Sequence, residues 1–222
     1  AMMKDDRMSL LSNLHLFDIS ILDRFVPGGK DLSGELDMGA NFEGTTESPK
    51  MYVSINTEKP SYQDIVFDSL NTDVRFEDNI FEIEQFILYG EGSEVSLNAM
   101  VEVSKSDSGS YEIKSDDNIE GKLLIKNLNL RLLEMFIGEN NSIEGTANAD
   151  IDIGGEIEKP RIRGNLDINK GSFATGPDSV LIDEFRFKSA VKDTVFTIQL
   201  ARAKVRENVI RLQGEIIYPE FK

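Results

Sequence analysis

The feature that most constrains the fold is an alternation of apolar and polar residues between Gly145 and Phe173. In residues 147–153 the odd positions are Ala or Ile and the even positions are Asn or Asp. After Pro160 the alternation resumes over residues 162–168. A period of two over this length predicts half-buried β-strands and not a helix. Pro160 has no backbone N–H to donate, so it belongs to a strand start or a connection.

The same stretch occurs earlier in the chain, 111 residues before. This shift places Gly34 on Gly145, Gly44 on Gly155, Glu47 on Glu158, Pro49 on Pro160, Lys59 on Lys170, Ser61 on Ser172, Tyr62 on Phe173, Leu70 on Leu181, Val74 on Phe185 and Phe76 on Phe187. Further on, a shift of 115 places Phe81 on Phe196, Ile83 on Ile198, Val95 on Ile210 and Leu97 on Leu212. We therefore expect the four extra residues to lie in a turn between Phe187 and Val195. Because the register is kept on both sides, the pattern indicates a true repeat, typical of solenoids and continuous sheets.

The repeat predicts one continuous structure and not two domains. Residues 1–9 are interpreted as a tag remnant with a frayed start, and the chain as an excised fragment. Residues 10–217 are predicted to form a single β-trough of two repeats, about 13–104 and 127–217, joined by 105–126. Asn13-Leu14-His15-Leu16 is aligned with Asn127-Leu128-Asn129-Leu130, which makes His15, the only histidine, an exposed strand residue.

Strands are expected at intervals of about 10–15 residues, which indicates a β-rich chain. In the first copy we expect them near 32–44, 50–57, 62–68, 70–77, 80–90 and 93–104. In the second we expect them near 143–154, 161–169, 171–175, 179–192, 194–205 and 208–217. A polar turn is expected at 104–110, about two strands over 111–130, and a short helix over 130–137. Parallel crossovers need a dozen or more linking residues, so these short links predict an antiparallel sheet.

Charge and composition exclude several classes of function. The chain carries 40 acidic and 24 basic residues, a net charge of −16, which argues against nucleic acid and anionic membrane surfaces as partners. The acidic residues are interpreted as a solvated outer face. No cysteine is present, which excludes disulfides and thiolate metal sites. Neither a signal peptide nor an apolar run of about 18 residues occurs in the sequence given.

Large apolar residues share one strand parity and are the candidate binding residues, as a groove lining for an apolar ligand. Covering such a face is worth several kcal/mol per strand, at about 25 cal/mol per Å². The face would be covered by a second sheet, by a helix layer, by closure into a barrel or by curling around an apolar ligand. Helix candidates are scarce in the sequence, so a helix layer is disfavoured. A plain sandwich core explains the pattern equally well. The candidates are Leu36, Met38, Phe42, Val53, Ile55, Val74, Phe76, Phe81, Ile83, Val95, Leu97, Ile151, Ile153, Ile162, Leu166, Ile168, Phe185, Phe187, Phe196, Ile198, Leu200, Ile210 and Leu212.

The residue patterns that would indicate an enzyme are missing from the sequence. It has no nucleophile elbow, no phosphate-binding glycine loop and no second histidine. The pairs Gly28-Gly29 and Gly154-Gly155 are interpreted as turns. Asp150 and Asp152 would suit a fragment of a calcium site or a general acid–base pair, but a solvated face explains them more simply. We therefore expect no enzyme, no cofactor and no metal site.

The stretch from Ile143 to Phe173 resembles the repeating unit of the TamB family, within the wider AsmA-like group. That unit combines two alternating strands with a fixed spacing of glycine and proline. In this sequence it is carried by Gly145, Gly155, Pro160, Gly164, Gly171 and Phe173. The first copy keeps Gly34, Gly44, Pro49 and Tyr62, but has Val53 for Gly164 and Pro60 for Gly171, so it is a degenerate match.

The resemblance implies an all-β fold, an elongated, curled antiparallel sheet (a β-taco, or open β-trough) with an apolar concave face and little or no helix. It further implies the periplasm of a diderm bacterium and an inner-membrane anchor outside this fragment. The function it implies is a hydrophobic groove that carries phospholipid, or another acyl-chain lipid, between the two membranes. Assembly of outer-membrane β-barrel proteins with a TamA-like barrel partner is the alternative, by presentation of sheet edges. A structural β-sandwich or solenoid adhesin with a closed core is the third hypothesis.

Overall fold

The computed structural model describes residues 8–20, 32–62, 65–90, 92–106, 109–133, 141–175 and 181–217. Almost all of them lie in β-strands, and the one further element with its own label is the 3-10 helix η2 (Leu130–Leu133). Within these ranges no helix has the length and apolar character needed to cross a membrane. The fold is therefore set by strand pairing.

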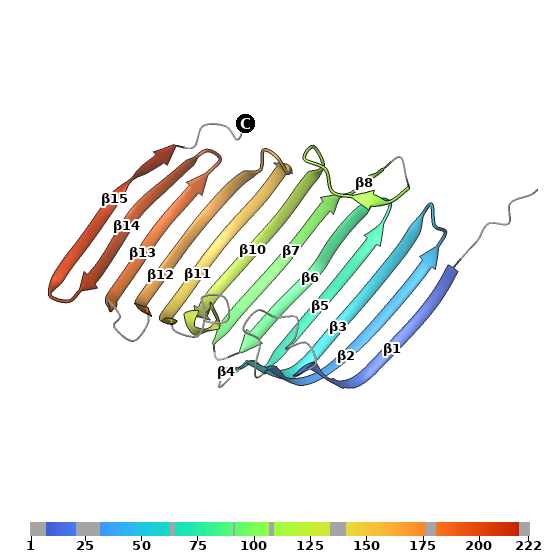
Figure 1. The fold of residues 1–222 in the computed structure, drawn as a ribbon, viewed down its shortest axis with the longest axis horizontal. Coiled ribbons are helices and arrows are strands. Elements are labelled where there is room, and N and C mark those ends of the chain that lie inside the picture. The colour runs from blue at the N-terminus through green and yellow to red at the C-terminus, as the bar shows by residue number, and fades with distance from the viewer. Residues whose placement is uncertain are drawn as a thin grey trace, which may run out of the picture.

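One 13-stranded antiparallel sheet contains nearly every strand, and each strand lies beside its neighbours in the sequence (Figure 1). A separate two-stranded hairpin, β8 (Ser104–Lys105) with β9 (Tyr111–Glu112), lies between β7 and β10 in the chain. The sheet runs β1 (Met8–Asp18), β2 (Leu32–Gly44), β3 (Pro49–Tyr62), β5 (Ser69–Glu77), β6 (Ile80–Gly90), β7 (Ser93–Glu102), β10 (Asn118–Asn129), β11 (Asn141–Glu156), β12 (Arg161–Thr175), β13 (Ile182–Lys192), β14 (Val195–Val205) and β15 (Asn208–Ile217), and the short β4 (Ile65–Val66) pairs with β3.

The predicted all-β antiparallel sheet is confirmed, and the sheet is not closed into a barrel, because β1 and β15 lie at its opposite ends (Figure 1). Some local predictions were wrong. The two strands expected at 161–169 and 171–175 are the single strand β12, whose register shifts at a bulge between Ile168 and Gly171. Of the helix expected over 130–137, residues 130–133 form η2 and the rest lies outside the described residues.

Backbone irregularities recur between the two halves of the sheet with a constant shift. The register shift between Leu14 and Phe17 in β1 matches the one between Ile125 and Leu128 in β10, 111 residues later. His15 therefore corresponds to Lys126, and its alignment with Asn129 was wrong by three residues. The Asn-Leu-x-Leu motif misled because each of these strands holds a bulge, which adds a residue and moves the alternation by one place.

The four extra residues of the second copy were also placed wrongly. The bulge between Asp73 and Val74 in the β5–β6 pair recurs between Lys188 and Ser189 in the β13–β14 pair, which is 115 residues later. The shift of 115 therefore already holds from Arg186 of β13 onward, and the extra residues precede Arg186, one of them at the bulge between Asp183 and Arg186. Sequence matching failed here because aromatic residues alternate on both sides of the true insertion.

Strand β7 pairs with β10 and joins the two halves into one sheet. The pairing opposes Val95 with Ile125 and Leu97 with Leu123, so apolar positions continue across the joint. On the other side of β10, Leu123 lies opposite Ile151 of β11. The two halves therefore share a single apolar face.

Gly164 of β12 is a position where the fold requires glycine. Its φ is 153°, and a Cβ built there would lie 2.1 Å from the carbonyl oxygen of Asp150 on β11. That oxygen belongs to the backbone of a central strand, so it cannot move without disturbing the ladder. The first copy has Val53 at the corresponding position, and Val53 is not among the residues with a positive φ, so the requirement for glycine belongs to the second copy alone.

We expect Gly164→Ala to lower the free energy of unfolding by roughly 1–3 kcal/mol, the range for residues held in strained backbone conformations. Gly214→Ala is the control, because no atom lies within 4 Å of a Cβ at that position. Urea-induced unfolding followed by circular dichroism measures both changes. Equal midpoints for the two variants would contradict the assignment.

Candidate functional site: the apolar face of the sheet

Strand register defines a continuous apolar face, because residues directly opposite each other on neighbouring strands point to the same side of a sheet. One row of paired residues crosses the first half from β2 to β7 as Phe42, Met51, Phe76, Phe81 and Val101. A row in the second half crosses from β11 to β15 as Ile151, Gly164, Val191, Phe196 and Ile216. The intervening strand β10 connects the rows through Ile119, Gly121 and Leu123.

The register brings the predicted residues onto this face with one exception. Leu200 lies opposite Lys188, a position of the other face. The reason is the bulge next to Ser189, which shifts the parity of β14 between Ile198 and Ala201. No alternation pattern reveals such a bulge, because it changes one strand relative to its neighbours.

Sequence reasoning missed the contribution of β10 to the face. Ile119, Leu123 and Ile125 of this strand lie opposite Val101, Leu97 and Val95 of β7. The signal was present, since apolar residues recur at every second position from 119 to 125 apart from Gly121. The prediction left these residues out of the face because it assigned 105–126 to a linker between the two copies.

The apolar face has no second layer packed over it in the described part of the chain. No large side chain in these ranges is fully buried, and most residues of the face are only half-buried. Toward the last strand exposure increases, and Leu212 of β15 is 56% exposed. The closed sandwich core that the sequence also allowed is therefore not formed by the described strands.

Three phenylalanines stack in a file on the second half of the face. The ring centroids of Phe185 and Phe187 are 6.2 Å apart, with planes at 14°. Those of Phe187 and Phe196 are 6.5 Å apart, with planes at 23°. We call these three residues the phenylalanine file. It offers a flat, apolar path from β13 to β14.

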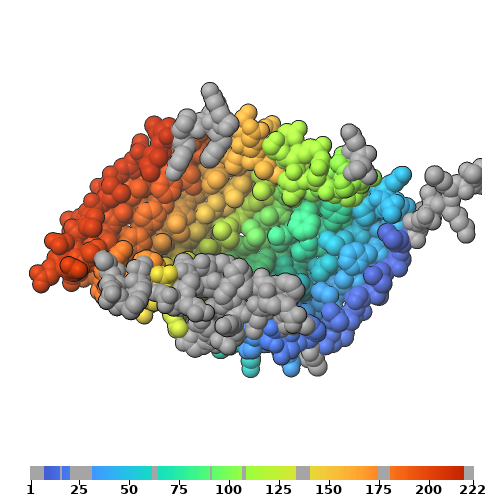
Figure 2. Space-filling model, in the orientation of Figure 1, coloured from blue at the N-terminus to red at the C-terminus, as the bar shows by residue number. Residues whose placement is uncertain are grey.

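Two small elements pack against opposite ends of the strands on the apolar side. At one end Tyr111 of the β8–β9 hairpin meets Phe76 edge to face, with ring centroids 5.0 Å apart. At the other end η2 buries Leu130, which is 3% exposed. Figure 1 shows these elements at the upper and lower ends of the sheet, and Figure 2 shows the sheet surface open to view between them.

The opposite face is polar and ion-paired. Lys122 lies 3.0 Å from a carboxylate oxygen of Asp150 and 3.2 Å from one of Asp152, and the hydrogen bonds to these carboxylates raise the pKa of Lys122. Both aspartates thus belong to a solvated, charge-paired surface. Among the described residues no three Asp, Glu or His side chains are grouped so that they could hold a metal ion.

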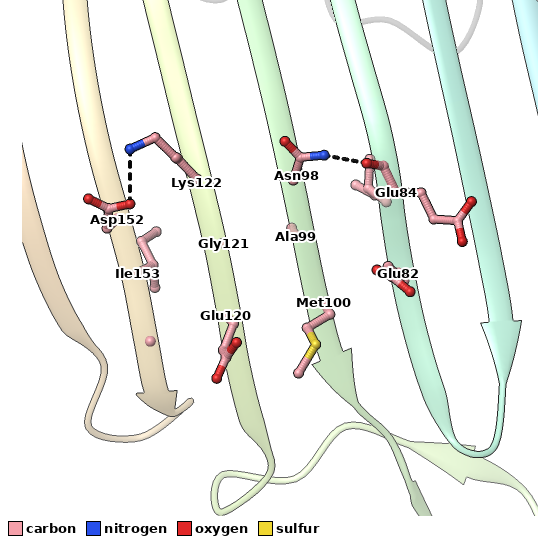
Figure 3. Close-up of a pocket in the computed structure, with 12 residues that line it drawn as sticks. Glu82, Glu84, Asn98, Ala99, Met100, Glu120, Gly121, Lys122, Asp152 and Ile153 are labelled. Atoms are coloured by element: carbon pink, nitrogen blue, oxygen red, sulfur yellow. Dashed lines mark hydrogen bonds and ion pairs between the residues drawn. The ribbon is translucent and has the colours of Figure 1, made fainter.

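A shallow hollow of 420 Å³ lies on the polar side, between side chains of β6, β7, β10 and β11 that include Asn98, Met100 and Lys122 (Figure 3). Its rim carries the carboxylates of Glu82, Glu84 and Glu120. With acidic groups predominating, the hollow is unsuited to anionic ligands. The apolar face is therefore the better candidate for a functional site.

The match to known families follows the strands of this sheet. The family model of the TamB N-terminal domain matches residues 7–168, from the start of β1 into β12. The chain belongs to the TamB family. Members of the TamB family are bacterial envelope proteins of a transport and assembly class, which is not a known class of enzymes. No solved structure matches the chain.

In this TamB domain Asp117 ties the β8–β9 hairpin to the start of β10. Its carboxylate accepts hydrogen bonds from the Ser104 hydroxyl and from the Lys114 backbone N–H, each at 2.6 Å. The bond from Ser104 and the bond from the Lys114 N–H lower the pKa of Asp117. The backbone oxygen of Asp117 accepts from Ile157 N–H at 3.0 Å, so the same turn also contacts the β11–β12 connection.

We expect Asp117→Asn to lower the urea midpoint at pH 7, because the amide keeps only one oxygen to accept two donors. A carboxylate whose pKa is lowered by folding stabilises the fold above its unfolded pKa of about 3.9 and loses that contribution as the pH falls further. The difference between wild type and variant should therefore shrink between pH 5 and pH 3. Asp116→Asn, at the exposed neighbouring position, is the control. A difference that is the same at both pH values would contradict this role.

Proposed function

We propose that this TamB domain is a segment of a lipid-conducting groove, and that its apolar face shields acyl chains on their way across the periplasm between inner and outer membranes. The observation that carries the proposal is one apolar face running through every strand from β1 to β15, without a second layer over it in the described residues. A monomeric soluble protein rarely exposes so large a contiguous apolar area unless it binds something there.

The chemistry of the two faces suits an acyl-chain lipid such as a phospholipid. Each buried CH₂ contributes about 0.8 kcal/mol, so a tail lying on the face gains stability at every position along it without specific polar contacts. Uniform binding of this kind allows a chain to slide. The ion-paired reverse face would keep the groove in solution, and head groups would stay at the open side. An inner-membrane anchor would come from a segment outside these 222 residues.

The groove lining in this proposal consists of the predicted residues on the apolar face, extended by Ile119, Leu123 and Ile125 of β10. The phenylalanine file lies within it. Met38, Ile55 and Ile83 lie in the first half, and Ile153, Leu166 and Ile168 in the second. Leu200 is left out of the lining because of its register.

A second candidate function is assembly of outer-membrane β-barrel proteins with a TamA-like barrel partner. Among the described strands, β1 and β15 each have a partner on one side only, and this favours the assembly role because an unpaired strand edge is a template for another strand. This mechanism depends on backbone groups at the edges. It would be insensitive to charges placed in the middle of the face.

We expect native mass spectrometry of the purified protein, incubated with phospholipid vesicles and re-isolated, to detect bound phospholipid. Leu166→Asp and Phe187→Asp place a carboxylate on the apolar face and should each reduce bound lipid at least tenfold, because an apolar environment disfavours an unpaired charge. Asn165→Asp adds the same charge at the neighbouring position on the polar face and should leave binding unchanged.

Circular dichroism establishes that each variant retains its β-sheet before lipid is counted. Lipid lost from folded Leu166→Asp and Phe187→Asp but kept by Asn165→Asp supports the groove. Absence of lipid from the wild type would overturn it. Capture of an unfolded β-barrel segment that persists in all three variants would favour the assembly role instead.

A further inference from the structure

An apolar cavity of 280 Å³ lies at the η2 end of the second half of the sheet. Leu130 of η2 covers it, and Ile168, Phe173 and Phe185 form its walls. Ile143, Ile182 and Ala203 complete the apolar side chains of the lining. Phe185 also begins the phenylalanine file, so the cavity borders the proposed groove.

The corresponding place in the first half is filled by the chain itself. There Phe67 is 6% exposed and Ile65 of β4 is 3% exposed, beside Ile19, which is 8% exposed. We call residues 65–67 the plug. The Phe67 backbone N–H donates a hydrogen bond to the Pro60 backbone oxygen at 2.8 Å, and this bond holds the plug against β3. By the shift of 115 residues, the position of Leu88 holds the smaller Ala203 in the second half. The register of β13 shifts between Asp183 and Arg186, so this shift gives no counterpart for Phe67.

A single glycine allows the plug in the first half. A Cβ at Gly90 would lie 2.4 Å from the Cα of Phe67, so the plug can approach only a residue without a side chain. The second half has Val205 at this position, directly opposite Ile182. The same close approach is therefore sterically blocked there. Two sequence differences, at Gly90 and Leu88, thus correspond to an open cavity in place of a filled one.

We propose that this cavity is a binding site for the distal end of one acyl chain, and that it gives the groove a preferred resting position. A cavity of about 150 Å³ holds a benzene ring, so 280 Å³ accommodates roughly a dozen carbons, enough for part of one tail and too little for two. Glu144 and Ser172 also belong to the lining, but its other side chains are apolar, and an apolar lining favours hydrocarbon over water. The inference rests on the proposed lipid function and locates one site within it.

The absence of tryptophan from the chain allows a direct test. Phe173→Trp places one fluorophore in the cavity wall, and Phe81→Trp places one on the same face in the first half. The probe is 11-bromoundecanoic acid, whose terminal bromine quenches only a nearby indole. We expect quenching of the Phe173→Trp protein at a concentration at least threefold lower than for the Phe81→Trp protein.

Ala203→Leu, added to the Phe173→Trp protein, installs the residue of the first half and should abolish this preference by filling the cavity. Ala201→Leu is the matched control, because Ala201 lies two residues away on the same strand and face but outside the cavity. Urea unfolding verifies that both variants are folded. Preference lost with Ala203→Leu and kept with Ala201→Leu supports the site.

Equal quenching at both indoles, or quenching that survives Ala203→Leu, overturns the cavity site and leaves the groove intact. No quenching at either indole while phospholipid remains bound in the mass spectrum also overturns the cavity site alone. No quenching together with no bound phospholipid removes both the cavity site and the proposed function.

Discussion

Unbroken antiparallel pairing between strands that follow one another in the chain is the constraint on which the rest of this structure depends. Each pairing carries the parity of one strand to the next, so a single apolar face extends from β1 to β15. Bulges adjust that parity locally, as after Leu14 in β1 and after Ile198 in β14, and return apolar residues to the common face. The face is therefore a product of register as much as of composition.

The separation of the two faces explains how one layer of strands can be stable and yet able to bind. Ion pairs such as Lys126 with Glu94, 2.9 Å apart, bridge neighbouring strands on the polar face. On the other face, neighbouring apolar side chains partly cover one another from water, as the stacked phenylalanines do. A hydrocarbon ligand would add the missing contacts from above without changing the backbone. The extent to which the apolar side chains are buried would then depend on whether a hydrocarbon ligand is bound.

Much of this architecture could be predicted from the alternation alone. Period two identified nearly every strand, and short links identified antiparallel neighbours. Three errors concerned register, at Leu200, at the alignment of His15 and at the place of the four-residue insertion. All three have one physical cause, because a bulge or an insertion alters register between strands while leaving each strand's own pattern intact. The cavity was equally invisible, since it arises from side-chain sizes at Ala203 and Ile182, which come together only in the folded sheet.

The nearest-neighbour strand order also has a kinetic meaning. Every pairing along the main sheet joins strands that are consecutive in the chain or separated only by short elements, as β3 and β5 are by β4, and β7 and β10 are by β8 and β9. Sheets usually fold slowly because distant segments must meet, whereas local pairing closes only short loops. This sheet can grow one strand at a time from either end, each new strand docking on an edge already formed. A chain emerging gradually into a new compartment could thus fold in the order in which it arrives.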